Sequence, residues 1–253
     1  ERSLKRAIAL QPGYAEAYSD LGIVLMRLKR FEEAITYFNK SITLKPTYAA
    51  AYSNLGIVLQ DLERFEEALA HYEKAINLSP GFSGAYSNQG NVFQELKRFQ
   101  EAINSYDAAI SFNPKYTEAH SNRGNALQAL KRYAEAIASY DKAIEIDPGY
   151  AEAHSNRGNA FLDMDLEEAV ASYDRSIALK PDYVEAYSNR GNALKKLKLF
   201  DAALASFDQA IMLKPDYVEA YWNKSLLLLL TGHFIDGWAL YEYRMKRKAY
   251  RRE

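Results

Sequence analysis

Seven prolines recur along this chain at an almost constant spacing, and this periodicity limits the possible folds more than any other feature. They are separated by 34, 34, 34, 34, 33 and 34 residues, and they are Pro12, Pro46, Pro80, Pro114, Pro148, Pro181 and Pro215. A fixed period of this size is typical of a repeat array, in which each unit packs only on its neighbours. We therefore expect the 253 residues to form a row of similar units.

Each unit contains two blocks of sequence with helical spacing. In the first block, AYSNLGIVL (51–59), Tyr52, Gly56 and Leu59 recur at i, i+4 and i+7. In the second, FEEALAHYEKAINLSP (65–80), an aromatic residue, an alanine and a tyrosine recur at i, i+3 and i+7. Both patterns predict an amphipathic helix with one buried stripe. Because the turn between the blocks is short and the proline ends the second helix, each unit is predicted to be an antiparallel helix hairpin.

Small residues recur at one place in each block, and we expect them to let the helices approach closely. They are glycine at 22, 56, 90, 124, 158 and 191, and alanine at 34, 68, 102, 136, 169 and 203. The unit with 33 residues has FLDMDLEEA (161–169) where its predecessor has LQALKRYAEA (127–136), so it lacks one residue in the turn. Leu166 and Ala169 keep their places, which predicts that the phase of the second helix is preserved.

The repeated pattern resembles the tetratricopeptide repeat (TPR), W-x2-L-G-x2-Y followed by A-x3-F, A and P, with Tyr or His in the place of Trp. The resemblance implies an all-α, right-handed superhelical solenoid of antiparallel helix hairpins that encloses a concave groove. It places six repeats at 15–48, 49–82, 83–116, 117–150, 151–183 and 184–217. Residues 1–14 are expected to be the second helix of a truncated repeat, and 218–253 a degenerate seventh repeat with a basic C-terminal end. Because Glu1 falls in the middle of a repeat, we expect the chain to be an excerpt of a longer protein.

Asparagines repeat on the first helix of successive units, away from the buried stripe when the helix is projected at about 100° per residue. The set two residues after the aromatic is Asn54, Asn88, Asn122, Asn156, Asn189 and Asn223, and the set five residues after it is Asn91, Asn125, Asn159 and Asn192. Asparagine is a mediocre helix former, so this repetition needs a reason. One interpretation is a polar residue on a solvated face. The other is a row of amides that binds the backbone of an extended peptide.

The asparagine row is similar to the one in the TPR arm of O-GlcNAc transferase, and this resemblance implies that the first set holds polypeptide substrates. The first repeat departs from it with Asp20. The carboxylate clamp of TPR receptors for chaperone tails requires a lysine directly after the aromatic. Serine occupies that place here, at 19, 53, 87, 121, 155 and 188, so we expect no such clamp.

Apolar residues replace the asparagines or their polar neighbours at both ends of the predicted groove. They are Ile23, Met26 and Ile57 at the N-terminal end, and Leu226, Leu229 and Leu230 at the C-terminal end. Such patches are candidate docking surfaces. For the leucines, the alternative is burial against a helix that begins at Phe234. Basic residues stand where a buried leucine is expected, at Arg123, Arg157, Arg190 and Lys224, and we expect them to form ion pairs between repeats, with anion recognition as the alternative.

Several classes of function are disfavoured. The chain has no cysteine, its four histidines form no constellation, and it has no nucleotide-binding loop, so we predict no catalytic residue, metal or cofactor. The longest purely apolar run, the five leucines 226–230, is far shorter than the roughly 18 residues of a membrane span. From Arg244 onward six basic residues accompany one acidic residue. The rest of the chain is acidic overall and offers no basic groove, so we predict no binding of nucleic acid.

These observations predict a non-catalytic scaffold for protein–protein interaction that binds extended polypeptide segments along an asparagine-lined concave groove. The expected partner is a protein or peptide, and the expected location is the cytoplasm. Two alternatives remain open. The chain is the substrate-recognition arm of a larger glycosyltransferase, because its end (232–253) resembles the TPR unit that precedes a glycosyltransferase-like domain in bacterial proteins. Otherwise it is a scaffold that forms homo-oligomers through exposed terminal repeats.

Overall fold

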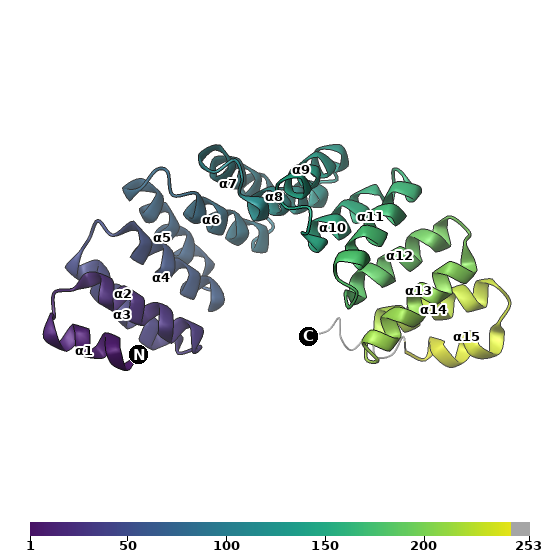
Figure 1. Cartoon of the computed structure of the whole chain (residues 1–253), viewed down its shortest axis with the longest axis horizontal. Coiled ribbons are helices and arrows are strands. Elements are labelled where there is room, and N and C mark those ends of the chain that lie inside the picture. Colours follow the sequence, from purple (N-terminus) through teal and green to yellow (C-terminus); the bar gives the residue numbers. More distant parts are fainter. Residues whose placement is uncertain (244–253) are drawn as a thin grey trace. The chain divides into compact units, whose positions relative to one another are not determined.

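The computed structural model describes residues 1–243, and all regular structure in this part of the chain is α-helical (Figure 1). The helices are α1 (Arg2–Leu10), α2 (Ala15–Arg27), α3 (Phe31–Leu44), α4 (Ala49–Asp61), α5 (Phe65–Leu78), α6 (Ser83–Glu95), α7 (Phe99–Phe112), α8 (Thr117–Ala129), α9 (Tyr133–Ile146), α10 (Ala151–Phe161), α11 (Leu166–Leu179), α12 (Val184–Lys196), α13 (Phe200–Leu213), α14 (Val218–Leu230) and α15 (Phe234–Tyr241). The basic end predicted from Arg244 onward lies outside the described residues.

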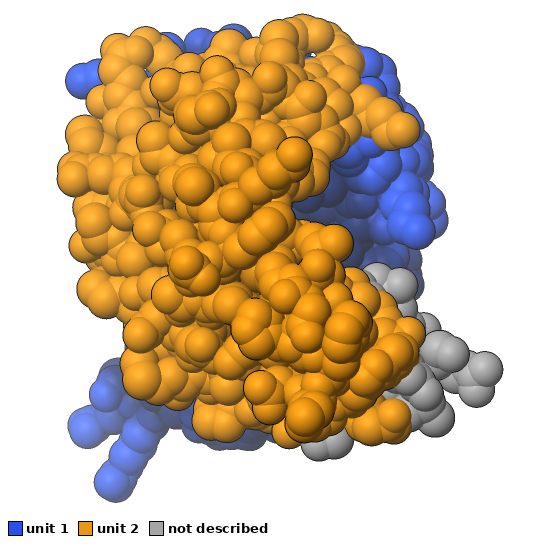
Figure 2. Space-filling view, turned by 90° about the vertical axis from the view of Figure 1, so that its right-hand side faces the viewer, with its two compact units in different colours: residues 1–130 blue, residues 131–253 orange. Residues whose placement is uncertain are grey.

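The chain divides into two compact units, Glu1–Leu130 and Lys131–Glu253, which are coloured separately in Figure 2. In the first unit α2 pairs with α3, α4 with α5 and α6 with α7. In the second unit α10 pairs with α11, α12 with α13 and α14 with α15, and within each unit every pair also packs on the next. The predicted all-α solenoid of helix hairpins is therefore confirmed. The division between the units lies in the turn after α8, inside the proposed fourth repeat (117–150), and the repeat boundaries themselves stay a proposal.

In the hairpins that keep the repeated glycine, an aromatic ring of the second helix lies on that glycine of the first helix. A Cβ atom added at Gly56 would lie 2.6 Å from the Tyr72 ring, and one added at Gly90 would lie 2.6 Å from the Tyr106 ring. Gly22, Gly158 and Gly191 face rings in the same way. Because the rings are fully buried, they have no room to retreat. Glycine is required here for close approach of the helices.

The turn inside most hairpins contains a residue with left-handed backbone geometry. Lys97 has a φ of 58°, and its N–H donates to the Gln94 carbonyl at 2.9 Å. The next N–H, of Arg98, donates to the Phe93 carbonyl at 2.8 Å. This pair of bonds satisfies carbonyls that the helix end leaves open. The same geometry occurs at 29, 63, 131 and 198, and the corresponding residue of the last hairpin is Gly232, with a φ of 83°.

The prediction that the short repeat lacks a residue in its turn is wrong, because the shortening falls in the first helix. Residues 162–165 separate α10 from α11, one more than the residues 197–199 that separate α12 from α13. Helix α10 has 11 residues, whereas α8 and α12 have 13, and α11 keeps the 14 residues of other second helices. Asp165 begins α11 by accepting a hydrogen bond from the Glu168 N–H at 3.1 Å. A Cβ at Gly158 would still lie 2.8 Å from the Tyr173 ring, which confirms that the helix phase is preserved.

We expect Gly90→Leu to lower the free energy of unfolding by about 1–3 kcal/mol, because the new side chain would overlap the buried Tyr106 ring. The matched control is Gly13→Leu, because a Cβ at Gly13 meets no atom within 4 Å. Denaturant unfolding followed by circular dichroism measures both. Equal stability of the two variants would contradict the close-contact interpretation.

We expect Lys97→Gly to raise the free energy of unfolding by up to about 1 kcal/mol, because it removes the cost of a left-handed backbone at a residue with a Cβ. Lys40→Gly, at an exposed place within α3, is the control and should lower stability by about 1 kcal/mol. Thermal melts of both variants test the prediction, which fails if the two changes shift the midpoint in the same direction.

Candidate functional site

The asparagines of both predicted sets are half-buried, and Asn91 and Asn159 accept hydrogen bonds from within the fold. In the first unit, Tyr106 Oη donates to Asn91 Oδ1 at 2.8 Å, and Asn122 Nδ2 donates to the same oxygen at 3.1 Å. The second unit repeats this arrangement at Asn159 Oδ1, which accepts from Tyr173 Oη at 2.7 Å and from Asn189 Nδ2 at 3.0 Å. An amide of one repeat is therefore linked to an amide of the next and anchored by a phenol.

The phenols that anchor these amides remain protonated donors. Burial raises the pKa of Tyr72, Tyr106, Tyr140 and Tyr173 well above the usual range for tyrosine. Tyr72 Oη donates to Gln60 Oε1 at 3.0 Å, and Tyr106 Oη also approaches Gln94 Oε1 at 3.3 Å. In both hairpins, the side-chain carbonyl of a glutamine on the first helix therefore accepts a hydrogen bond from the tyrosine hydroxyl of the second helix.

Each linked pair of amides retains one NH2 group and one carbonyl oxygen that make no hydrogen bond among the described residues. Asn91 Nδ2 and Asn122 Oδ1 have no hydrogen bond to another described residue, and the same is true of Asn159 Nδ2 and Asn189 Oδ1. A peptide unit offers one N–H and one C=O, which is the complementary set. From the sequence, every asparagine is expected to offer all of its amide donors and acceptors to a ligand. In the structure, some of these donors and acceptors form hydrogen bonds inside the fold.

Four other asparagines make no hydrogen bond with their side chains among the described residues. These are Asn54, Asn88, Asn192 and Asn223, and all four are half-buried. Asn192 corresponds to Asn91 and Asn159 in the repeat pattern, but the ring opposite it belongs to Phe207, which has no hydroxyl. Its amide is therefore not anchored in the way that its two counterparts are.

The basic residues that replace the expected leucine form ion pairs between successive repeats. Arg123 Nε lies 2.6 Å from Asp107 Oδ1, and Arg157 Nε lies 2.6 Å from Asp141 Oδ1. Arg190 pairs with Asp174 in the same way, and Lys224 with Asp208. The prediction of inter-repeat ion pairs is confirmed. Because the cations are already paired, the alternative of anion recognition loses its support.

The predicted apolar ends are partly used in packing. Ile23, Met26 and Ile57 pack against the core of the first unit. Near the C-terminal end Leu229 contacts Gly237 of α15, where an added Cβ would lie 2.8 Å from its side chain. Leu226 is half-buried and Leu230 is 67% exposed. As docking surfaces, these two patches stay predictions.

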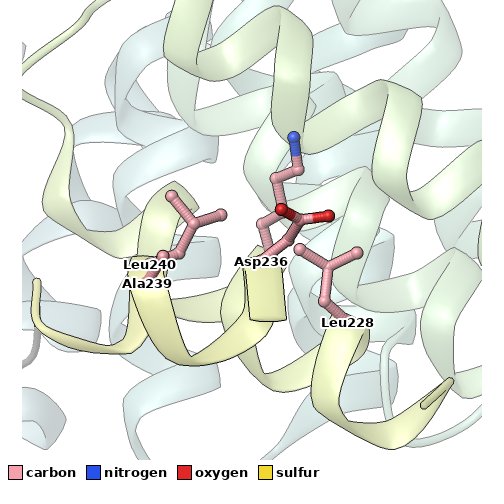
Figure 3. A pocket seen from close by; sticks show the side chains of 5 residues that line it. Leu228, Asp236, Ala239 and Leu240 are labelled. Atoms are coloured by element: carbon pink, nitrogen blue, oxygen red, sulfur yellow. The ribbon is translucent and has the colours of Figure 1, made fainter. Parts of the chain in front are cut away.

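A further apolar surface on α15 was not predicted from the sequence. Phe234, Ile235 and Trp238 are 60%, 88% and 57% exposed. Their spacing at i, i+1 and i+4 in a predicted helix was the available signal, because it indicates an apolar stripe. The α14–α15 hairpin also has a cavity of about 310 Å³, lined by Lys224 and Leu228 of α14 and by Asp236, Ala239 and Leu240 of α15. Figure 3 shows the side chains that line it.

Two of the histidines, His120 and His154, lie against backbone carbonyl groups. His120 Nε2 lies 3.0 Å from the Pro114 carbonyl oxygen and His154 Nε2 lies 3.3 Å from that of Pro148. Within residues 1–243, no group of three or more histidine, cysteine or carboxylate side chains is arranged to hold a metal ion. No helix in the same range combines the length and the apolar character that a membrane crossing requires.

Comparisons with known families identify the repeat. Models described as tetratricopeptide repeat match residues 13–81 and 184–217, and one described as TPR repeat matches residues 90–131, 124–165 and 165–198. These matches cover most of the sequence, so the chain belongs to the tetratricopeptide repeat family. A search of curated proteins finds no match.

Solved structures with the same fold include several bacterial proteins. The chain is 26% identical to YrrB, described as a TPR protein with an unusual peptide-binding site, with a TM-score of 0.60 over 72% of this chain and 95% of YrrB. It is 20% identical to PilF of Pseudomonas aeruginosa, with a TM-score of 0.71 over 81% and 94% of the two chains. A tetratricopeptide repeat protein from Parabacteroides merdae gives 17% identity and a TM-score of 0.72 over 90% and 91%. The last two establish similarity of fold alone.

We expect Asn159→Ala to lower the free energy of unfolding by about 1 kcal/mol, because the buried Tyr173 hydroxyl loses its acceptor. Asn192→Ala is the matched control and should be neutral or slightly stabilising, since Phe207 makes no such bond and alanine is the better helix former. Unfolding in urea measures both. The anchoring role is refuted if adding Tyr173→Phe to Asn159→Ala recovers none of the lost stability.

Proposed function

We propose that this TPR scaffold binds extended polypeptide segments through its rows of asparagines. The observation that carries the proposal is the donor and acceptor left over by each linked amide pair, Asn91 with Asn122 in one unit and Asn159 with Asn189 in the other. Anchoring to a buried tyrosine fixes the orientation of these amides before a ligand arrives, which reduces the entropy lost on binding. Main-chain recognition of this kind depends little on peptide sequence.

The similarity to YrrB supports a peptide as the ligand. That protein is described as having an unusual peptide-binding site, and 95% of its length aligns with this chain. The serines in the place of the chaperone-tail clamp, such as Ser53 and Ser87, are buried, so a surface clamp at that place has no support. The proposed ligand is therefore a peptide main chain laid along the amides. A role as the arm of a larger glycosyltransferase and self-assembly through terminal repeats stay predictions.

The test is affinity selection from a synthetic random-peptide library with free carboxyl termini, followed by measurement of Kd for selected peptides by fluorescence polarisation. The test variant carries Asn88→Ala and Asn122→Ala. The control variant carries Asn39→Ala and Asn77→Ala, which remove exposed asparagines from the second helices α3 and α5.

Each lost amide contact removes about 0.5–1.5 kcal/mol, so the test variant should bind selected peptides about 5- to 150-fold more weakly. Its thermal midpoint should remain close to that of the wild type, because alanine favours the helix. Unchanged affinity in the test variant, or an equal loss in the control, would refute the proposed site.

A further inference from the structure

In α12, Asn192 is followed one turn later by Lys195, which has no partner among residues 1–243. Lys195 lies four residues after Gly191, and the corresponding residues in α4 and α6 are Gln60 and Gln94. Those glutamines are close to the hydroxyls of the tyrosines on the second helices. The α12–α13 hairpin has neither residue of this glutamine–tyrosine pair, because Lys195 replaces the glutamine and Phe207 replaces the tyrosine.

The ammonium group of Lys195 is left without internal compensation. Lys195 is half-buried, and within residues 1–243 it makes no hydrogen bond or ion pair. Burial and the positive charge of Lys196 both lower its pKa, and no carboxylate acts on it in the opposite direction. Its neighbour differs, because Lys196 Nζ is 2.8 Å from Asp163 Oδ1 and 3.1 Å from the Leu162 carbonyl oxygen.

The surroundings of Lys195 belong to the proposed peptide site. Asn192 is three residues earlier on α12 and is therefore its neighbour on the helix surface. Asn189, one further turn back, is the residue that links to Asn159. A peptide whose main chain follows these amides would pass a half-buried cation that lacks a counter-ion.

We propose that Lys195 is a specificity position of the groove and binds a carboxylate of the bound peptide. This inference rests on the proposed function, because it concerns a ligand already held by the asparagines. A carboxylate supplies the opposite charge and the hydrogen-bond acceptors that no described side chain provides. The carboxylate comes either from an aspartate or glutamate side chain or from the C-terminus of the peptide.

The experiment uses the whole chain and the same synthetic peptide library. Peptides selected by the wild type are resynthesised in pairs that differ only in Glu or Gln at each acidic position, and in a free or amidated C-terminus. Affinities are measured for the wild type, for Lys195→Gln and for the control Lys196→Gln. Lys195→Gln restores the residue type of Gln60 and Gln94, so it should fold normally.

We expect the wild type and Lys196→Gln to prefer one carboxylate over its neutral counterpart by about tenfold, and the preference to weaken as salt is added. Lys195→Gln should bind the neutral peptide as well as the wild type does and show no preference. Loss of the preference on Glu→Gln substitution identifies a side chain as the source, and loss on amidation identifies the C-terminus.

Two results overturn the inference while leaving the proposed function intact. One is a set of selected peptides without any carboxylate preference, and the other is a preference that survives in Lys195→Gln. Failure of the wild type to select any peptide has a different meaning, because it overturns the proposed function and this inference together.

Discussion

The contact between an aromatic ring and a glycine, repeated in hairpins of both units, is the interaction on which the rest of the structure depends. It sets the distance between the two helices, and it also places the far end of the ring. Tyr106 lies on Gly90 with its ring and reaches Asn91 with its hydroxyl, and Tyr173 does the same with Gly158 and Asn159. One residue therefore both closes the hairpin and orients an amide of the candidate site. A change that loosens the packing would also loosen the amides.

A second constraint concerns how one hairpin packs on the next. The residue type at the position that provides this contact changes along the chain. The residue directly before the repeated glycine is leucine at 21 and 55, glutamine at 89 and arginine at 123, 157 and 190, and Lys224 takes this place before Ser225. The leucines are buried, and Gln89 Oε1 accepts a hydrogen bond from Ser105 Oγ at 3.0 Å inside its own hairpin. Leucine packing is non-directional, whereas the Arg123–Asp107 pair joins two fixed points on successive helices. Such pairs are partly exposed and contribute about 0–1 kcal/mol each, so their main effect is to favour one stacking register.

Residues that repeat at a fixed interval allowed most of the fold to be predicted from the sequence. Gly56, Tyr72 and Pro80 between them indicate two helices, their close approach and the end of the second. The left-handed geometry of Lys97 was not predictable from residue type, because lysine does not favour it. In the candidate site, projection of a single helix placed Asn91 on one face. It gave no account of Tyr106, which reaches Asn91 from another helix at a distance that packing determines. Helix periodicity likewise indicates an apolar stripe on α15 that includes Ile235, but it carries no information about whether another element covers that stripe.

On the polar face of this array, internal hydrogen bonding and ligand binding compete for the same amide and charged side chains. A hydrogen bond satisfied inside the fold, such as that of Tyr173 with Asn159, makes the structure more specific and leaves less capacity for a ligand. A half-buried group without a partner costs stability and is available for binding. The change from tyrosine to Phe207 removes an internal donor, and the change from glutamine to Lys195 introduces a charge that no residue in 1–243 pairs with, in the same hairpin. Under the proposed function, the repeats therefore need not contribute equally to recognition. Repeats with the anchoring tyrosine would supply oriented amides for a peptide main chain, and the α12–α13 repeat would supply the charge that distinguishes one side chain or chain end from another.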